Sequence, residues 1–179
     1  MPRPLIATTL ASFMGLLLVV PAAAQAPSNP AETCRKDAKF REQDFTLGSW
    51  DVYTGDKKTD EVTMTLILND CAIEEHWTKK DGHPTGNGIG LFNYSALLGS
   101  WGYTWATDNG AATSFRGNLV KPGEMLYVTE KPLAGGKVRL RHWTLSLMAD
   151  GTIRELATGT EDGGKTWTTD YDLKWVRRK

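Results

Sequence analysis

The sequence predicts an all-β fold: an up-and-down antiparallel β-barrel of about ten strands, preceded by a short helix. Three observations lead to this prediction. From residue 49 onward, apolar and polar residues alternate in short segments, which is the pattern of half-buried strands. Turns rich in Gly, Asn, Asp and Pro separate these segments, so most connections are hairpins. No long helical pattern interrupts them, which excludes crossover connections between parallel strands.

One segment before the strands has a helical pattern. It covers residues 35–44, where Ala38 and Phe40 lie among charged residues. The predicted strands follow at residues 49–54, 60–68, 71–78, 88–95, around 101–105, 112–120, 124–130, 138–147, 152–160 and 165–178. Closure into a barrel is favoured because the strand faces combine large aromatic residues with glycines, as in the tapered interior of a closed sheet. A ring of about eight to ten strands has room for one small ligand.

The first 24 residues have the features of a secretory signal peptide. Arg3 precedes an apolar run over residues 5–20, and three alanines at 22–24 suit cleavage. The run is shorter than the roughly 20 apolar residues of a membrane span, so we expect no stable membrane anchor. Residues 25–34 are then a disordered lead-in, and residues 35–179 form a single barrel domain in the periplasm or outside the cell.

The charge balance argues against nucleic acid as a partner. The chain has 21 basic and 21 acidic residues, and removal of residues 1–24 takes away only Arg3. The remaining 20 basic and 21 acidic residues give a net charge of −1. Phosphate binding needs a basic excess, which this chain lacks.

Cys34 and Cys71 are the only cysteines. An even number in an oxidising compartment suggests a disulfide, although two unrelated thiols remain the alternative. Neither cysteine has a histidine pattern nearby, so we expect no metal site.

Residues 47–50, Leu-Gly-Ser-Trp, resemble the Gly-x-Trp signature of lipocalins and their calycin relatives. The resemblance implies that Gly48 and Trp50 belong to the closed end of the barrel, with Trp50 as a plug beneath the short helix. It also implies a basic side chain from the last strand over that plug, for which Arg177 and Arg178 are placed. The chain further resembles the DUF1579 family of bacterial proteins of unknown function, through residues 44–52, 71–77 and 162–167. That family implies a calycin-like barrel and brings no established reaction.

Residues 160–167 resemble the Asp box of sialidases and other propellers. In that hairpin Asp162 would bond the turn amides, a glycine would take a positive φ, and Trp167 would pack beneath. Propellers repeat the motif, whereas this chain has one copy, so we predict a structural turn only.

Glu75 is the most suggestive candidate for chemistry. If Ile73 and Trp77 face the barrel interior, the period of two places Glu75 there with them. A carboxyl group among aromatic residues would have a raised pKa, and it could act as an acid or base or orient a ligand. The alternative is an ion pair with an inward arginine, for which the candidates are Arg116, Arg139 and Arg141.

Aromatic residues on the strand faces would line a cavity with flat apolar surface. We assign to ligand binding Glu75, Trp77, Phe92, Tyr94, Trp101, Tyr103, Trp105, Arg141 and Trp143. Ordinary core packing must hold for some aromatic residues, notably Trp50 and Trp167. The expected partner is an apolar small molecule or a lipid, oriented by Glu75 and an inward arginine. Haem held by a histidine is a less favoured alternative, because His76 and His142 are expected to point outward.

Three classes of function follow from these observations. We favour an exported barrel that binds a small apolar molecule or lipid, without a cofactor and not as an enzyme. The second class is a small barrel isomerase or hydrolase that uses Glu75 as acid or base. The third is a structural or partner-binding module with a filled interior, which an exposed apolar patch would favour. Nothing in the sequence indicates an oligomeric state.

Overall fold

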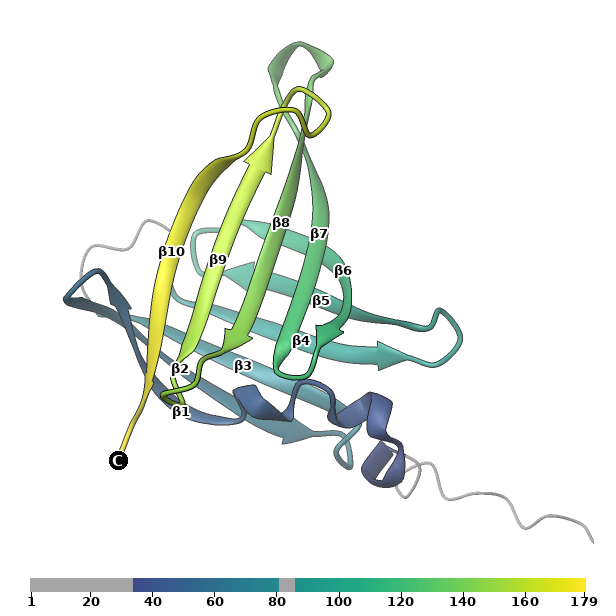
Figure 1. The fold of residues 1–179 in the computed structure, drawn as a ribbon, viewed down its shortest axis with the longest axis vertical. Coiled ribbons are helices and arrows are strands. Elements are labelled where there is room, and N and C mark those ends of the chain that lie inside the picture. The colour runs from purple at the N-terminus through teal and green to yellow at the C-terminus, as the bar shows by residue number, and fades with distance from the viewer. Residues whose placement is uncertain (1–33, 81–85) are drawn as a thin grey trace, which may run out of the picture.

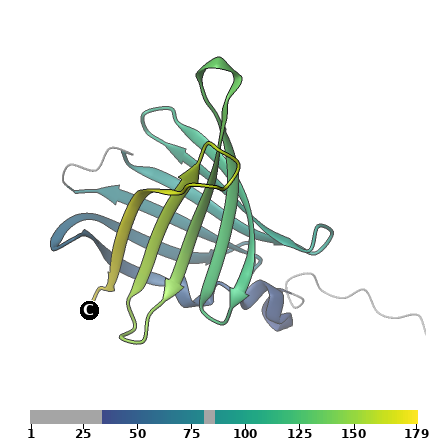
Figure 2. The same ribbon diagram turned by 45° about the horizontal axis from the view of Figure 1, so that its top comes forward.

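The computed structural model describes residues 34–80 and 86–179, which form a closed barrel of ten antiparallel strands (Figure 1). The strands are β1 (Gly48–Thr54), β2 (Lys57–Ile67), β3 (Ala72–Lys79), β4 (Gly88–Ser95), β5 (Ser100–Thr107), β6 (Ala112–Lys121), β7 (Glu124–Pro132), β8 (Val138–Leu147), β9 (Ile153–Thr160) and β10 (Thr168–Arg177). Each strand pairs with its neighbours in sequence, and β10 pairs with β1. The predicted up-and-down barrel is therefore confirmed. Strands β7 to β10 lie in front of β2 to β6 and run across them (Figure 2).

The segment before β1 differs from the single helix predicted over residues 35–44. One turn of helix at residues 34–36 is followed by two short 3-10 helices, η1 (Ala38–Arg41) and η2 (Asp44–Thr46). Asp37 interrupts the helix, because its backbone is extended and its side chain accepts a hydrogen bond from the Lys39 amide at 2.9 Å. Among the described residues, no helix has the length and hydropathy needed to cross a membrane.

The closed end of the barrel is built around Trp50, as the Gly-x-Trp resemblance implied. Trp50 is fully buried, and its indole donates a hydrogen bond to the Thr46 carbonyl at 2.8 Å. The guanidinium of Arg177 lies over the ring, 4.1 Å from the centroid, and also donates to the Leu47 carbonyl. Gly48 has φ +114°, and a Cβ there would lie 2.5 Å from Arg177 Nη1, so this position requires glycine.

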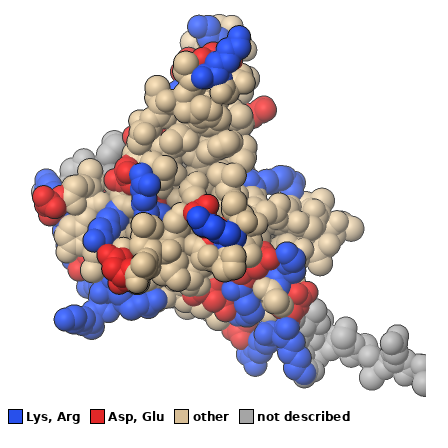
Figure 3. Space-filling view, in the orientation of Figure 1, with Lys and Arg blue, Asp and Glu red and all other residues tan. Residues whose placement is uncertain are grey.

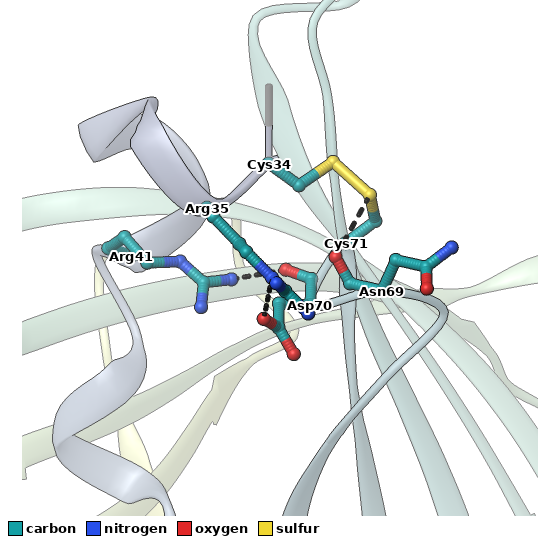
Figure 4. Close-up of a disulfide and its surroundings, with 6 residues drawn as sticks. All are labelled: Cys34, Arg35, Arg41, Asn69, Asp70 and Cys71. Carbon is teal, nitrogen blue, oxygen red and sulfur yellow. Dashed lines mark hydrogen bonds and ion pairs between the residues drawn. A yellow bond between two sulfur atoms is a disulfide. The ribbon is translucent and has the colours of Figure 1, made fainter. Parts of the chain in front are cut away.

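A disulfide joins Cys34 to Cys71 and attaches the N-terminal segment to the turn between β2 and β3 (Figure 4). Cys34, expected at the end of a disordered lead-in, is buried. Arg35 supports the junction, donating to Asp70 Oδ2 at 2.6 Å, and Arg41 donates to the Asp70 carbonyl. The predicted signal peptide and the rest of the lead-in, residues 1–33, lie outside the described residues.

The Asp-box turn forms as predicted around Asp162. Its Oδ1 accepts hydrogen bonds from the amides of Lys165 and Thr166 at 3.0 and 2.9 Å. Gly163 and Gly164 both have positive φ. The turn occupies residues 161–167, so β10 begins at Thr168 rather than at the predicted residue 165.

The prediction that Trp167 packs in the core is wrong. The residue is 39% exposed, and its ring lies against His142 on the outside of the barrel, 4.3 Å between centroids. The reason is local, because the indole donates a hydrogen bond to the Gly164 carbonyl at 3.2 Å. This bond holds the ring against the turn and away from the barrel interior.

Most charged residues lie on the outside of this fold. On the face drawn in Figure 3, basic and acidic side chains are interspersed over the strands and turns. The core inside is mainly apolar and rich in aromatic residues, and at the closed end it includes Trp50, Val52, Trp101 and Trp175.

Candidate functional site

The barrel is hollow at the end opposite the Trp50 plug. A cavity of about 320 Å³ lies inside the open end, and its lining includes Asn109 and Ala111 from the turn between β5 and β6. In an up-and-down barrel this turn lies at the end opposite the turn between β2 and β3, which carries the disulfide. Asn109 and Ala111 are exposed, so the cavity communicates with solvent.

Six of the nine residues assigned to ligand binding line this cavity. They are Glu75, Trp77, Tyr103, Trp105, Arg141 and Trp143. The remaining lining is contributed mainly by β6, β9 and β10, with Phe115, Glu155 and Tyr171 as its larger side chains.

The other three residues assigned to ligand binding, Phe92, Tyr94 and Trp101, do not line the cavity. Phe92 is fully buried and stacks on Tyr103 with ring centroids 4.1 Å apart. Tyr94 contacts Phe40 of the N-terminal segment, and Trp101 donates to Glu42 Oε2 at 3.1 Å. All three lie toward the closed end, because β4 ends there and β5 begins there.

Glu75 faces the barrel interior from β3, as predicted. It is 2% exposed, and its Oε2 accepts a hydrogen bond from the Tyr103 hydroxyl at 2.6 Å. Gly90 on β4 makes room for this pair, since a Cβ there would lie 2.3 Å from Glu75 Oε2. Burial raises the pKa of Glu75 to about 8; the Tyr103 hydrogen bond opposes the rise and the nearby Glu155 adds to it.

The ion pair considered for Glu75 does not form with any of the three arginines proposed for it. Arg141 lines the cavity, but its Nε donates to Asp170 Oδ2 at 3.0 Å. Arg139 is bound to the same carboxyl group at 2.6 Å, and Arg116 is exposed on the outer face. Arg139 and Arg141 therefore form a charged group with Asp170 at the cavity mouth. Glu75 keeps its hydrogen bond from Tyr103.

Glu155 on β9 is a second buried carboxyl group in the cavity wall, and the sequence analysis missed it. Its Oε1 accepts from the Trp143 indole and its Oε2 from the Trp175 indole, both at 2.9 Å. Burial raises the pKa of Glu155 to about 7, against the opposing effect of the hydrogen bonds from its aromatic donors. The signal was available, because Glu155 alternates with Ile153 and Ala157 on the inward face of its strand.

Asp60 on β2 is a third buried carboxylate that sequence reasoning missed. It is fully buried, and its Oδ1 accepts from the Trp77 indole at 3.0 Å. It too alternates with inward apolar residues, Val62 and Met64. The barrel interior therefore pairs acidic side chains with aromatic donors on three separate strands.

Neither of the two histidines in the described part of the chain lines the cavity. His76 lies on the outer face with Nε2 2.9 Å from Glu74 Oε2, and His142 packs against Trp167 outside the barrel. His83 lies outside the described residues. In residues 34–80 and 86–179 there is no group of three or more His, Cys, Asp or Glu side chains that could hold a metal ion. Neither His76 nor His142 is placed to bind a haem iron in the cavity.

The fold and the cavity define a closed ten-stranded barrel with one end plugged and the other end hollow and lined by aromatic residues. Comparison with known proteins adds no family to this description. No protein-family model matches the chain, and no curated protein matches it with significant sequence similarity.

Proposed function

We propose that this barrel binds one small, largely apolar molecule in its open-ended cavity. The observation that carries the proposal is the aromatic lining of that cavity together with the Glu75–Tyr103 pair on its wall. Ligand sites are typically apolar pockets with a few polar groups that orient the ligand.

The size of the cavity narrows the ligand class. At about 320 Å³ it lies at the lower end of the usual range for small-molecule sites, roughly 300–1,000 Å³. A compact molecule with one or two rings therefore suits it better than a long lipid chain. Arg141, paired with Asp170 at the mouth, is placed to contact the outer end of such a molecule.

We further propose that the protein acts after export, in the periplasm or outside the cell, as a DUF1579-type barrel. The Cys34–Cys71 disulfide supports export, because such bonds persist in oxidising compartments. The ten-stranded barrel is the kind of fold that the DUF1579 resemblance implied.

A second candidate is a small barrel enzyme that uses Glu75 as acid or base. The specific observation in its favour is the 2.6 Å hydrogen bond between Glu75 and Tyr103 in a cavity open to solvent. A carboxyl group with a pKa of about 8 can give or take a proton near neutral pH. Turnover of a bound compound that disappears in Glu75→Gln, with binding retained, would select this candidate.

Fluorescence titration with N-phenyl-1-naphthylamine, a neutral aromatic probe, tests the binding proposal. We expect saturable binding of one probe per barrel, with energy transfer from the cavity tryptophans. Thr113→Trp should abolish binding because Thr113 lines the cavity. Ala112→Trp is the matched control, since the adjacent residue is exposed on the same strand. Absence of saturable binding, or equal effects of the two variants, would overturn the proposal.

The natural ligand can be sought by native mass spectrometry of the protein purified from its own source. A co-purifying small molecule that is absent from Thr113→Trp would identify the ligand and its place in the cavity together.

A further inference from the structure

Two carboxyl groups in the wall of one cavity have no basic partner in the described chain. Glu75 on β3 and Glu155 on β9 both line the cavity, and neither forms an ion pair with a described residue. Their hydrogen bonds come from uncharged aromatic donors: Tyr103 for Glu75, and Trp143 and Trp175 for Glu155. Ionisation of either group therefore places a negative charge inside the barrel with no described basic side chain in direct contact with it.

The rings around these carboxyl groups favour a positive charge. Trp77, Trp105 and Trp143 line the same cavity, and the face of an indole attracts a cation. An anionic ligand would be repelled by either group in its ionised form, and a wholly apolar ligand would leave both without a cationic partner. We propose that the cavity binds a small aromatic or apolar amine in its protonated form, with the ammonium group on Glu75 and the apolar body against the tryptophan rings. This inference rests on the proposed function and specifies its ligand class.

Glu75 is the better ammonium acceptor of the two. Both oxygens of Glu155 already accept from indoles. Glu75 uses Oε2 for Tyr103, and its Oε1 receives no hydrogen bond from any described residue. An ammonium group has three donors, so it can bind Glu75 Oε1 and still contact a ring face.

The charged and titratable groups that face Glu75 come from five strands. They are Tyr103 on β5, Tyr127 and Lys131 on β7, Arg141 on β8, Glu155 on β9 and Tyr171 on β10. Arg141 and Lys131 are the cations in this set: the charge of Arg141 is engaged by Asp170, and Lys131 is exposed to solvent. Binding an ammonium group requires ionised Glu75, whose pKa of about 8 means that a proton leaves on binding at neutral pH. Affinity for the amine should therefore rise with pH from about 6.5 to about 8.5.

Three naphthalene derivatives of similar shape test the charge preference: 1-naphthylmethylamine, the neutral 1-naphthylmethanol and the anionic 1-naphthoate. Isothermal titration calorimetry near pH 8.5 should show the amine binding on the order of tenfold more tightly than the alcohol, and the naphthoate more weakly than either. Glu75→Gln should remove the preference for the amine and leave the alcohol unchanged. Glu74→Gln, which alters the neighbouring outward-facing residue, should change neither.

Proton release is a second readout that needs only the wild-type protein. Titrations of the amine near pH 7 in two buffers of different ionisation enthalpy should show about one proton released per amine bound, and none for the alcohol. Equal affinity for amine and alcohol, tightest binding of naphthoate, or amine binding without proton release would overturn this inference alone. Failure of all three compounds and of N-phenyl-1-naphthylamine would instead overturn the proposed function, and this inference with it.

Discussion

Arg177 covers the buried ring of Trp50, and its Nη1 donates to the carbonyl of Leu47, 130 residues earlier in the chain. The contact links the last strand to the first at the closed end of the barrel. It also explains the neighbouring glycine, because the guanidinium occupies the space that a side chain at position 48 would need.

Replacing Arg177 by alanine should expose the ring of Trp50 at the closed end of the barrel. We expect Arg177→Ala to lower the free energy of unfolding by about 1–3 kcal/mol, through loss of the cation–π contact and the hydrogen bond to Leu47. Urea denaturation measures this loss. Arg178→Ala is the control: its exposed pairs with Asp51 and Glu61 should contribute less than about 1 kcal/mol. Equal losses in the two variants would argue against the plug contact.

A side chain at position 48 should be tolerated poorly. Gly48→Ala meets both an unfavourable φ of +114° and an overlap with Arg177 Nη1 at 2.5 Å. We expect a loss of about 2 kcal/mol or more in unfolding free energy. Gly55→Ala also has positive φ but has no atom within 4 Å of its Cβ, so it should lose only about 1 kcal/mol.

The buried Glu75 should make the protein less stable as pH rises. The folded pKa of about 8 exceeds the ordinary value of 4.5 for a glutamate carboxyl group, so the unfolded chain releases this proton first. Stability is therefore highest below about pH 4.5 for this group and falls until about pH 8. Glu75→Gln should be more stable than wild type near pH 8, by on the order of a few kcal/mol, and similar near pH 4.

Thermal or urea unfolding of both proteins across this pH range checks the prediction. Glu155 titrates near pH 7 and adds a slope of the same sign, which Glu75→Gln leaves in place. Glu74→Gln should retain the wild-type pH profile. A Glu75→Gln protein with the same pH profile as wild type would show that Glu75 ionises normally.

Reduction of the disulfide should destabilise the barrel without dismantling it. The bond closes a separation of 37 residues and holds the N-terminal segment against the turn between β2 and β3. We expect loss of about 2–4 kcal/mol in the Cys34→Ser, Cys71→Ser double variant, measured by urea denaturation. Dithiothreitol should produce the same loss in wild type and none in the double variant, because reduction acts only through this bond.

The sequence predicts which side of the barrel wall a residue faces better than it predicts the height of that residue along the barrel axis. Alternation along β3 correctly placed Glu75 and Trp77 inside. Phe92 and Trp101 are also inside, yet they pack at the closed end, because strand stagger and the positions of the turns decide the height of each residue. Those features arise from the register of all ten strands together, which local periodicity does not contain.

Other differences have equally specific causes. The position of the Trp167 ring is set by a hydrogen bond within its own turn, and the residue precedes β10, so the inward–outward alternation of that strand does not include it. Alternation does place Glu155 and Asp60 on the inward faces of their strands. Charged residues are rarely buried, however, so their burial is expected only once the indoles that donate hydrogen bonds to them are known. The plug, the Asp-box turn and the strand order depend on short local signals, and these were predicted correctly.

The pairing of β1 with β10 fixes when the barrel can close. Residues 50–53 find their partners only at residues 174–177, so the seam that completes the ring is made from the first and last strands. A ribosome will have synthesised nine strands before the missing edge of β1 can be covered. Until the final strand is free, the chain remains an open sheet with the cavity and the plug both incomplete. The topology itself therefore delays closure of the barrel until β10 has been synthesised.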